Sequence, residues 1–322
     1  VANSALAILQ SLFFGKRIAQ TQIHEPPIFI VGHWRSGTTL VHELLNLDDN
    51  LKSPTTYECF APSHFLVSSW WLKPLIALVT PKTRPMDNMQ HGPNRPQEDE
   101  FAICALGAPS PYSAMAFPNQ PRPNQSMIDL LDATDEQLQS LAESMLFFTK
   151  SLTFTHAKRL VLKSPTHTGR IDFLRELFPG AKFLHISRDP KSVIPSTVRL
   201  WTRLDQVNGF QIPHYDQSAI ETYVGETFSQ MYTAFNKQTQ DQDKDIYSLR
   251  YEDIVENPVE CLRSFYDYFK LPGFDQMEPK IKSHMEQQAN YQKNRHTLSE
   301  ELLEIIQQNC TNYQTRYGYE KT

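Results

Sequence analysis

Residues 32–39 have the spacing of glycine and hydroxyl side chains that is typical of a loop binding a phosphate or sulfate group. In the sequence GHWRSGTT, Gly32, Gly37 and Thr39 match the nucleotide-binding motif G-x-x-x-x-G-K-[ST]. The lysine of that motif is replaced by Thr, and the cation of the loop is Arg35. A nucleoside triphosphatase needs this lysine on its β- and γ-phosphates. The loop therefore argues against ATP or GTP hydrolysis, while its backbone N–H groups can still hold an oxyanion.

A second pair of anion-binding side chains follows the strand expected at residues 182–186. Arg188 stands at the end of that strand, and Ser196 lies inside the helix expected to follow it. A guanidinium group meets phosphate oxygens in pairs, and a hydroxyl eight residues later can bind the same anion. Read alone, Arg188 could equally form a surface ion pair with Asp189 at the start of the helix.

Parallel strands must position these side chains. Apolar runs without alternation at residues 28–31, 159–162 and 182–186 predict strands buried on both faces of a sheet. A helical pattern follows each run, and Asp189 with Pro190 is a favourable start for the third helix. This order predicts parallel strands with ligand groups at their carboxyl ends. We expect an α/β fold, a three-layer P-loop sandwich with a parallel sheet of four or five strands and helices on both faces.

The rest of the chain predicts one domain, residues 1–322, because no linker rich in Gly, Ser or charge divides it. Residues 2–20, within the N-terminal segment 1–25, predict an amphipathic helix, either packed on the outside of the domain or lying at a membrane surface. Residues 61–157 predict an insertion over the acceptor site, because its middle is rich in proline and poor in periodicity. Pro74 should divide an apolar stretch of this insertion into two short helices. Residues 201–215 predict a loop.

Composition excludes several classes of protein. The net charge of −5 gives no reason to expect nucleic-acid binding. The four cysteines are widely spaced, which suggests neither a zinc site nor a disulfide framework and fits a reducing cytoplasm. No run of 18 apolar residues is present, so we expect no membrane span. The sequence begins at Val1 rather than Met, and it gives no indication of the oligomeric state.

The loop GHWRSGTTL resembles the 5′-phosphosulfate-binding loop of sulfotransferases that use 3′-phosphoadenosine 5′-phosphosulfate (PAPS). The resemblance implies a metal-free enzyme whose nucleotide product is 3′,5′-adenosine bisphosphate. It also implies that Arg188 and Ser196 hold the 3′-phosphate, which distinguishes PAPS from ATP. The residues implied to hold the 5′-phosphate and sulfate are Arg35, Ser36, Gly37, Thr38 and Thr39.

Two further assignments rest on weaker similarity to this family. Tyr251 lies in a Tyr-Glu-Asp stretch followed by Asn-Pro, which in the family lies near the adenine. Lys293 lies where the family has a basic loop that closes on the 3′-phosphate. Leu40 departs from the cytosolic members, which have Trp directly after Thr-Thr. The overall pattern resembles bacterial and tyrosyl-protein sulfotransferases more closely.

The reaction implied is an in-line displacement on sulfur, which needs a base for the acceptor, a cation at the leaving oxygen, and positioning. Lys163 aligns with the family lysine that we expect at the leaving oxygen. Three side chains stay open as the base. Glu58 lies where tyrosyl-protein members carry a catalytic Glu, His167 lies near the strand end, and Glu98, like its neighbour Asp99, belongs to the insertion.

The resulting hypothesis is transfer of a sulfuryl group from PAPS to a hydroxyl or amine of a small-molecule acceptor. Lipid, glycan and protein tyrosine acceptors stay open. The alternatives are a P-loop kinase-like phosphotransferase, which would need the missing lysine and a magnesium-binding Asp, and a non-catalytic nucleotide-binding module.

Overall fold

A parallel sheet forms the centre of the molecule. The computed structural model describes residues 2–80, 92–214, 216–239, 243–287 and 298–320. Within them five strands pair in parallel in the order β2-β3-β1-β4-β5. Along that order the strands are Leu51–Lys52 (β2), Arg159–Lys163 (β3), Ile28–Val31 (β1), Lys182–Ser187 (β4) and Ile246–Arg250 (β5). The expected parallel sheet is therefore confirmed. Its central strand is β1, which precedes the loop of residues 32–37.

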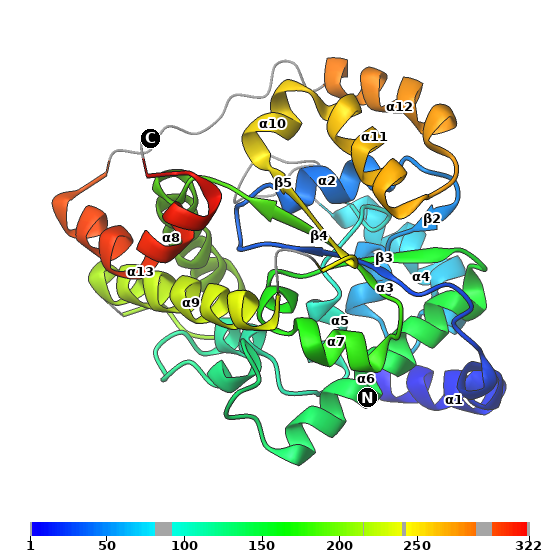
Figure 1. Cartoon of the computed structure of the whole chain (residues 1–322). Coiled ribbons are helices and arrows are strands. Elements are labelled where there is room, and N and C mark those ends of the chain that lie inside the picture. The colour runs from blue at the N-terminus through cyan, green and yellow to red at the C-terminus, as the bar shows by residue number, and fades with distance from the viewer. Residues whose placement is uncertain (1, 81–91, 215, 240–242, 288–297, 321–322) are drawn as a thin grey trace.

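Helices cover both faces of the sheet (Figure 1). One face packs against α2 (Thr38–Leu45), α10 (Tyr251–Glu256), α11 (Pro258–Phe269) and α12 (Phe274–Gln287). The other packs against α6 (Asp135–Thr155), α7 (Ile171–Leu177), α8 (Pro190–Asn208), α9 (Gln217–Gln238) and α13 (Glu300–Tyr317). Figure 1 shows α10, α11 and α12 above the strands and α6, α7 and α9 below them.

The central strand β1 has no alternation of apolar and polar residues because both of its faces are buried. Ile28 and Ile30 contribute to the core on the α2 face, whereas Phe29 and Val31 contribute to the core on the α9 face. All four side chains are fully buried. Successive strand residues point to opposite faces, so a strand covered on both sides must be apolar throughout.

The remaining helices lie beyond the second face. They are α1 (Ala2–Gln20), α3 (Thr56–Phe60), α4 (Phe65–Val79) and α5 (Glu100–Ala105), with 3-10 turns η1 (Pro111–Ala116), η2 (Gln125–Met127) and η3 (Pro165–Gly169). Helix α1 packs on α4 and α6. Among the described residues, no helix is both long and apolar enough to cross a bilayer.

Two sequence predictions about helices are wrong. A loop was expected over residues 201–215, but α8 continues to Asn208, because Trp201 and Leu204 are buried in the core and hold the chain helical. A break was expected at Pro74, but α4 runs through it. Pro74 is exposed, so the backbone groups that it leaves unpaired lie at the surface, where water can satisfy them.

A buried ion pair fastens the 92–130 segment to the sheet. Both side chains of the Arg170–Glu100 pair are fully buried, with Nη1 2.9 Å from Oε2. The hydroxyls of Thr166 and Ser110 also donate to the Glu100 carboxylate, and Arg170 Nε donates to the carbonyl of Met127. Burial raises the pKa of Glu100, but the charge and hydrogen bonds of Arg170, the charge of His167 and the hydrogen bond of Ser110 together outweigh it and lower the pKa.

We predict that Arg170→Met lowers the free energy of unfolding by about 3–5 kcal/mol, because it leaves the Glu100 carboxylate buried without a cation. Urea unfolding followed by circular dichroism measures this change. The double variant Glu100→Gln/Arg170→Met should recover part of the loss. Equal losses in the single and double variants would show that packing of the arginine, rather than its charge, matters here.

Candidate active site

The loop after β1 forms an open cradle at the start of α2. Gly37 has a φ of +103°, and a Cβ there would lie 2.2 Å from Cδ2 of Tyr251, so only glycine fits. Within the described part of the chain, the N-cap residue of α2 is Gly37, which gives the first N–H groups of the helix no side-chain hydrogen bond. The hydroxyl of Ser36 is buried and has no hydrogen-bond partner among the described residues. Free N–H groups and an unused hydroxyl at a helix start fit an anion.

The structure joins this loop to the second predicted anion site. Arg35 Nε donates to Ser196 Oγ at 2.9 Å, and Arg188 Nη1 donates to the carbonyl of Arg35 at 2.9 Å. The Arg188 guanidinium also lies over the ring of Tyr251, 4.1 Å from its centroid. Four residues singled out from distant stretches of the sequence are therefore connected beside the cradle, and two of them, Arg35 and Arg188, are cations.

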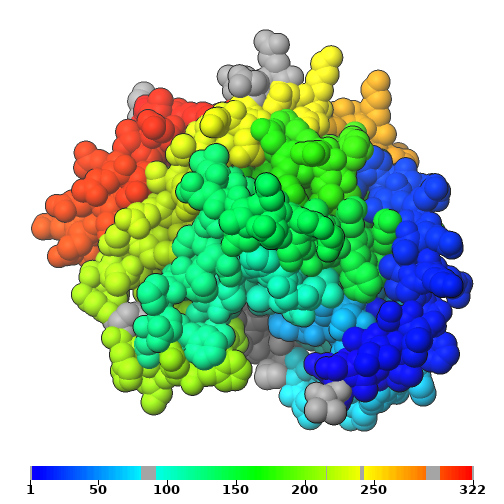
Figure 2. Space-filling model, turned by 90° about the horizontal axis from the view of Figure 1, so that it is seen from below, coloured from blue at the N-terminus to red at the C-terminus, as the bar shows by residue number. Residues whose placement is uncertain are grey.

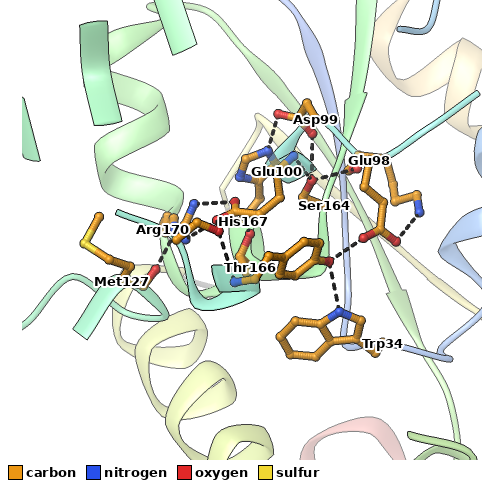
Figure 3. Close-up of polar contacts among 12 residues, drawn as sticks. Trp34, Glu98, Asp99, Glu100, Met127, Ser164, Thr166, His167 and Arg170 are labelled. Atoms are coloured by element: carbon orange, nitrogen blue, oxygen red, sulfur yellow. Dashed lines mark hydrogen bonds and ion pairs between the residues drawn. The ribbon is translucent and has the colours of Figure 1, made fainter. Parts of the chain in front are cut away.

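A second group of side chains lies at the carboxyl end of β3 (Figure 3). Lys163 Nζ lies 2.7 Å from Oε1 of Glu98, and the hydroxyl of Tyr112 donates to Oε2 of the same carboxylate. Trp34 Nε1, from the loop itself, donates to the Tyr112 oxygen at 3.0 Å. Burial and the charge of Glu98 raise the pKa of Tyr112 well above its usual range, so it stays a donor. The Glu98 side chain keeps 17% of its surface exposed, against 3% for Lys163.

His167 is enclosed rather than open to an acceptor. Its side chain is fully buried, its Nε2 lies 2.7 Å from Oδ2 of Asp99, and its ring edge packs on Phe29. The hydroxyl of Ser164 donates to the other oxygen of Asp99. Burial raises the pKa of Asp99, but the charge of His167 and these hydrogen bonds outweigh it and lower the pKa. This arrangement fixes Asp99 and, with it, the neighbouring Glu98.

Glu58 lies at the start of α3 and is occupied by structural contacts. Its Oε2 accepts from the Thr55 N–H at 2.7 Å in a capping box, and Lys52 Nζ lies 3.4 Å away. His156 Nε2 lies 3.4 Å from the other oxygen. Burial raises the pKa of Glu58, but His156, Lys52 and Thr55 outweigh it and lower the pKa to about 2. A carboxylate of this kind is a weak base at neutral pH.

Comparison with known protein families identifies the family of this chain. Residues 26–276 match the profile of the Sulfotransferase family. The chain belongs to the sulfotransferase family. Over 322 residues this sulfotransferase is 39% identical to the omega-hydroxy-beta-dihydromenaquinone-9 sulfotransferase Stf3 of Mycobacterium tuberculosis (strain CDC 1551 / Oshkosh), covering 100% of the chain and 82% of that protein. The Stf3 of Mycobacterium bovis (strain ATCC BAA-935 / AF2122/97) matches equally.

Solved structures share the fold of this sulfotransferase. Sulfotransferase STF9 from Mycobacterium avium superposes with a TM-score of 0.71 at 19% identity, over 97% of this chain and 81% of that one. Sulfotransferase STF1 from Mycobacterium tuberculosis H37Rv gives 0.65 at 18% identity, over 94% and 80%. At these identities the likeness establishes the architecture alone.

Sequence reasoning missed two residues of the site. Trp34 lies inside the recognised loop, at a position where the motif accepts any residue, so the motif gave no signal. Tyr112 lies in an irregular stretch without periodicity, and only the folded chain brings it to Glu98. Thr38 and Thr39 begin α2 as expected, whereas Lys293 lies outside the described residues.

We predict that Glu58→Gln lowers the free energy of unfolding, relative to wild type, by more at pH 7 than at pH 3. With a folded pKa of about 2 and an ordinary value of 4.5, the carboxylate stabilises fully above about pH 4.5 and loses its effect as the pH falls through 2. The deficit should be about 3 kcal/mol at pH 7 and roughly half of that at pH 3.

Urea unfolding at the two pH values measures the deficit. Glu304→Gln, at an exposed position of α13, is the matched control and should show no such dependence. A Glu58→Gln deficit that stays constant with pH would contradict a paired, ionised Glu58.

Proposed function

We propose that this sulfotransferase takes its sulfuryl group from PAPS and transfers it to a hydroxyl, or an amine, of a small apolar molecule. The observation that carries the donor assignment is the direct contact between the two predicted phosphate sites, through Arg35 Nε and Ser196 Oγ at 2.9 Å. A donor that bears phosphate at both its 5′ and 3′ positions would need such a continuous site.

The residues around the cradle fit this donor. The α2 N-terminus and the unused Ser36 hydroxyl would hold the 5′-phosphosulfate, together with Arg35, Gly37, Thr38 and Thr39. Arg188 and Ser196 would hold the 3′-phosphate, with the Tyr251 ring beside the base. The cations Arg35, Lys163 and Arg188 would supply the positive charge, so no metal is needed.

We assign the base to Glu98 and the leaving-group cation to Lys163. Each oxygen of the Glu98 carboxylate accepts one hydrogen bond and keeps capacity for another, so it can take the acceptor proton. The new S–O bond to the acceptor forms as the S–O bond to the 5′-phosphate oxygen breaks. Neutralising Glu98 weakens its hold on Lys163, whose ammonium group is then free to stabilise the negative charge on the leaving oxygen.

Tyr112, Asp99 and His167 act as positioning residues in this scheme. Tyr112 orients Glu98 from the insertion side, while the Asp99–His167 pair anchors the chain next to it. We propose that residues 61–157 cover the acceptor within a single sulfotransferase domain. The four cysteines, all free, are in keeping with a cytoplasmic location.

The acceptor class is inferred from the named relatives and from the site. The relatives act, by name, on an omega-hydroxylated dihydromenaquinone. Aromatic side chains adjoin the base here as well, since the rings of Phe101 and Tyr112 meet edge to face with centroids 4.9 Å apart. We therefore propose a hydroxyl at the end of an apolar chain as the acceptor.

Glu98→Gln should lower kcat by about 10²–10⁴ because the amide cannot take up the acceptor proton. Release of 3′,5′-adenosine bisphosphate in the presence of an omega-hydroxylated menaquinone measures turnover. Glu58→Gln, assayed under conditions where it remains folded, should keep most of the wild-type kcat. A larger loss of kcat in Glu58→Gln than in Glu98→Gln would assign the base to Glu58.

Binding of 3′,5′-adenosine bisphosphate should raise the melting temperature without magnesium. A ligand concentration of a hundred times Kd should raise the free energy of unfolding by about 2.7 kcal/mol. Arg188→Ala should abolish the shift, because the 3′-phosphate loses its guanidinium partner. ATP with magnesium is the comparison ligand. A shift with ATP and magnesium alone would instead support a kinase-like phosphotransferase.

A further inference from the structure

Helices α1 and α4 leave an unusually apolar surface open to solvent. Figure 2 shows the N-terminal helix and the neighbouring α4 region together at one corner of the molecule. We define the α1/α4 face by six side chains with more than half of their surface exposed: Leu12 75%, Phe13 67%, Trp70 78%, Leu75 55%, Leu78 82% and Val79 81%. The six side chains belong to two helices that pack on each other, and exposed apolar side chains gathered in this way mark an interaction site.

The two helices form one face rather than two independent ones. The side chain of Gln10 in α1 is almost fully buried, and its Oε1 accepts from the N–H of Leu66 in α4 at 2.8 Å. A polar side chain with so little exposure fixes the two helices against each other. The apolar side chains therefore act as a single preformed surface.

The charge that α1 and α4 themselves carry is opposite in sign to the net charge of the chain. Neither helix contains Asp or Glu, although the chain has 36 acidic residues and a net charge of −5. Both helices contain cations, namely Lys16 and Arg17 in α1 and Lys73 in α4. An apolar surface with basic residues at its border is complementary to an anionic lipid bilayer. A second copy of the same face would bring like charges together.

Aromatic rings connect this region with the proposed base. Phe60, at the end of α3 and 56% exposed, lies with its ring centroid 5.1 Å from that of Phe101. Phe101 in turn meets Tyr112, which donates to Glu98. Helix α3 packs on α4, so the series of rings begins beside the α1/α4 face and ends at the carboxylate.

We propose that the α1/α4 face docks this sulfotransferase on the surface of an anionic lipid bilayer. An acceptor with an apolar chain would then pass from the bilayer along Phe60 and Phe101 to Glu98; this second step rests on the function proposed above. Helices of this kind lie in the interface with their apolar side chains among the lipid headgroups and acyl chains, without spanning the bilayer.

Co-sedimentation with lipid vesicles tests the docking. Wild type should bind vesicles of phosphatidylglycerol and phosphatidylcholine more tightly than vesicles of phosphatidylcholine alone. Trp70→Glu/Leu78→Glu should weaken binding to the anionic vesicles at least about tenfold, because it removes two apolar groups and adds repelled charge. The matched control is Phe210→Glu/Ile212→Glu, at positions 83% and 77% exposed outside the face, and it should bind like wild type.

Three results would overturn the docking proposal. They are equal binding of the face variant and wild type, equal binding to both kinds of vesicle, and a wild-type dimer that the face variant makes monomeric without any vesicle binding. The last result would assign the face to contacts between copies of the chain.

Binding of 3′,5′-adenosine bisphosphate to both variants separates this proposal from the proposed function. A thermal shift equal to that of wild type shows that the fold and donor site are intact. Vesicle binding without nucleotide binding would contradict only the proposed function, and nucleotide binding without vesicle binding would contradict only the docking.

Discussion

The site depends on the attachment of three consecutive carboxylates to the carboxyl end of β3. Glu98 meets Lys163, Asp99 meets Ser164 and His167, and Glu100 meets Arg170. Removing one partner from a buried ion pair is costly, because the remaining charge cannot be hydrated. The three contacts therefore fix one register between residues 98–100 and the sheet. They place a partly exposed carboxylate beside the strand end, where ligands of parallel sheets are bound.

Local environment gives three glutamates three different tasks. Glu100 is fully enclosed and paired with Arg170, so it acts as an anchor. Glu58 caps α3 and is held ionised by nearby donors and cations, so its affinity for a proton is low. Glu98 alone of the three combines partial exposure with a lysine that aligns with the family's leaving-group cation. The same side-chain chemistry thus serves stability in two places and catalysis, as we propose, in the third.

The loop after β1 couples the two ends of the site. Its residue Trp34 donates to Tyr112 on the proposed acceptor side, and the next residue, Arg35, donates to Ser196 on the proposed donor side. Its first N–H, that of Gly32, donates to Thr168 in the turn that also carries His167. Neighbouring residues of this loop thus hold the proposed base, the proposed donor cradle and the end of β3 in fixed positions relative to one another. An in-line transfer requires such positioning.

The sequence by itself determined the parallel sheet and the glycine-bounded loop between β1 and α2, because these features depend on local patterns: buried β-branched runs, glycine spacing and helix-start residues. Only the tertiary structure placed Glu98 beside Lys163. Glu98 meets Lys163 across 65 positions, and Tyr112 comes from a stretch without periodicity, so no local pattern reports either contact. The continuation of α8 past residue 201 has the same origin, since the burial of Trp201 depends on segments distant in sequence. Long-range burial and charge pairing, which carry no local signature, give Glu58, Glu98 and His167 different surroundings, although the sequence left the three equal as candidates.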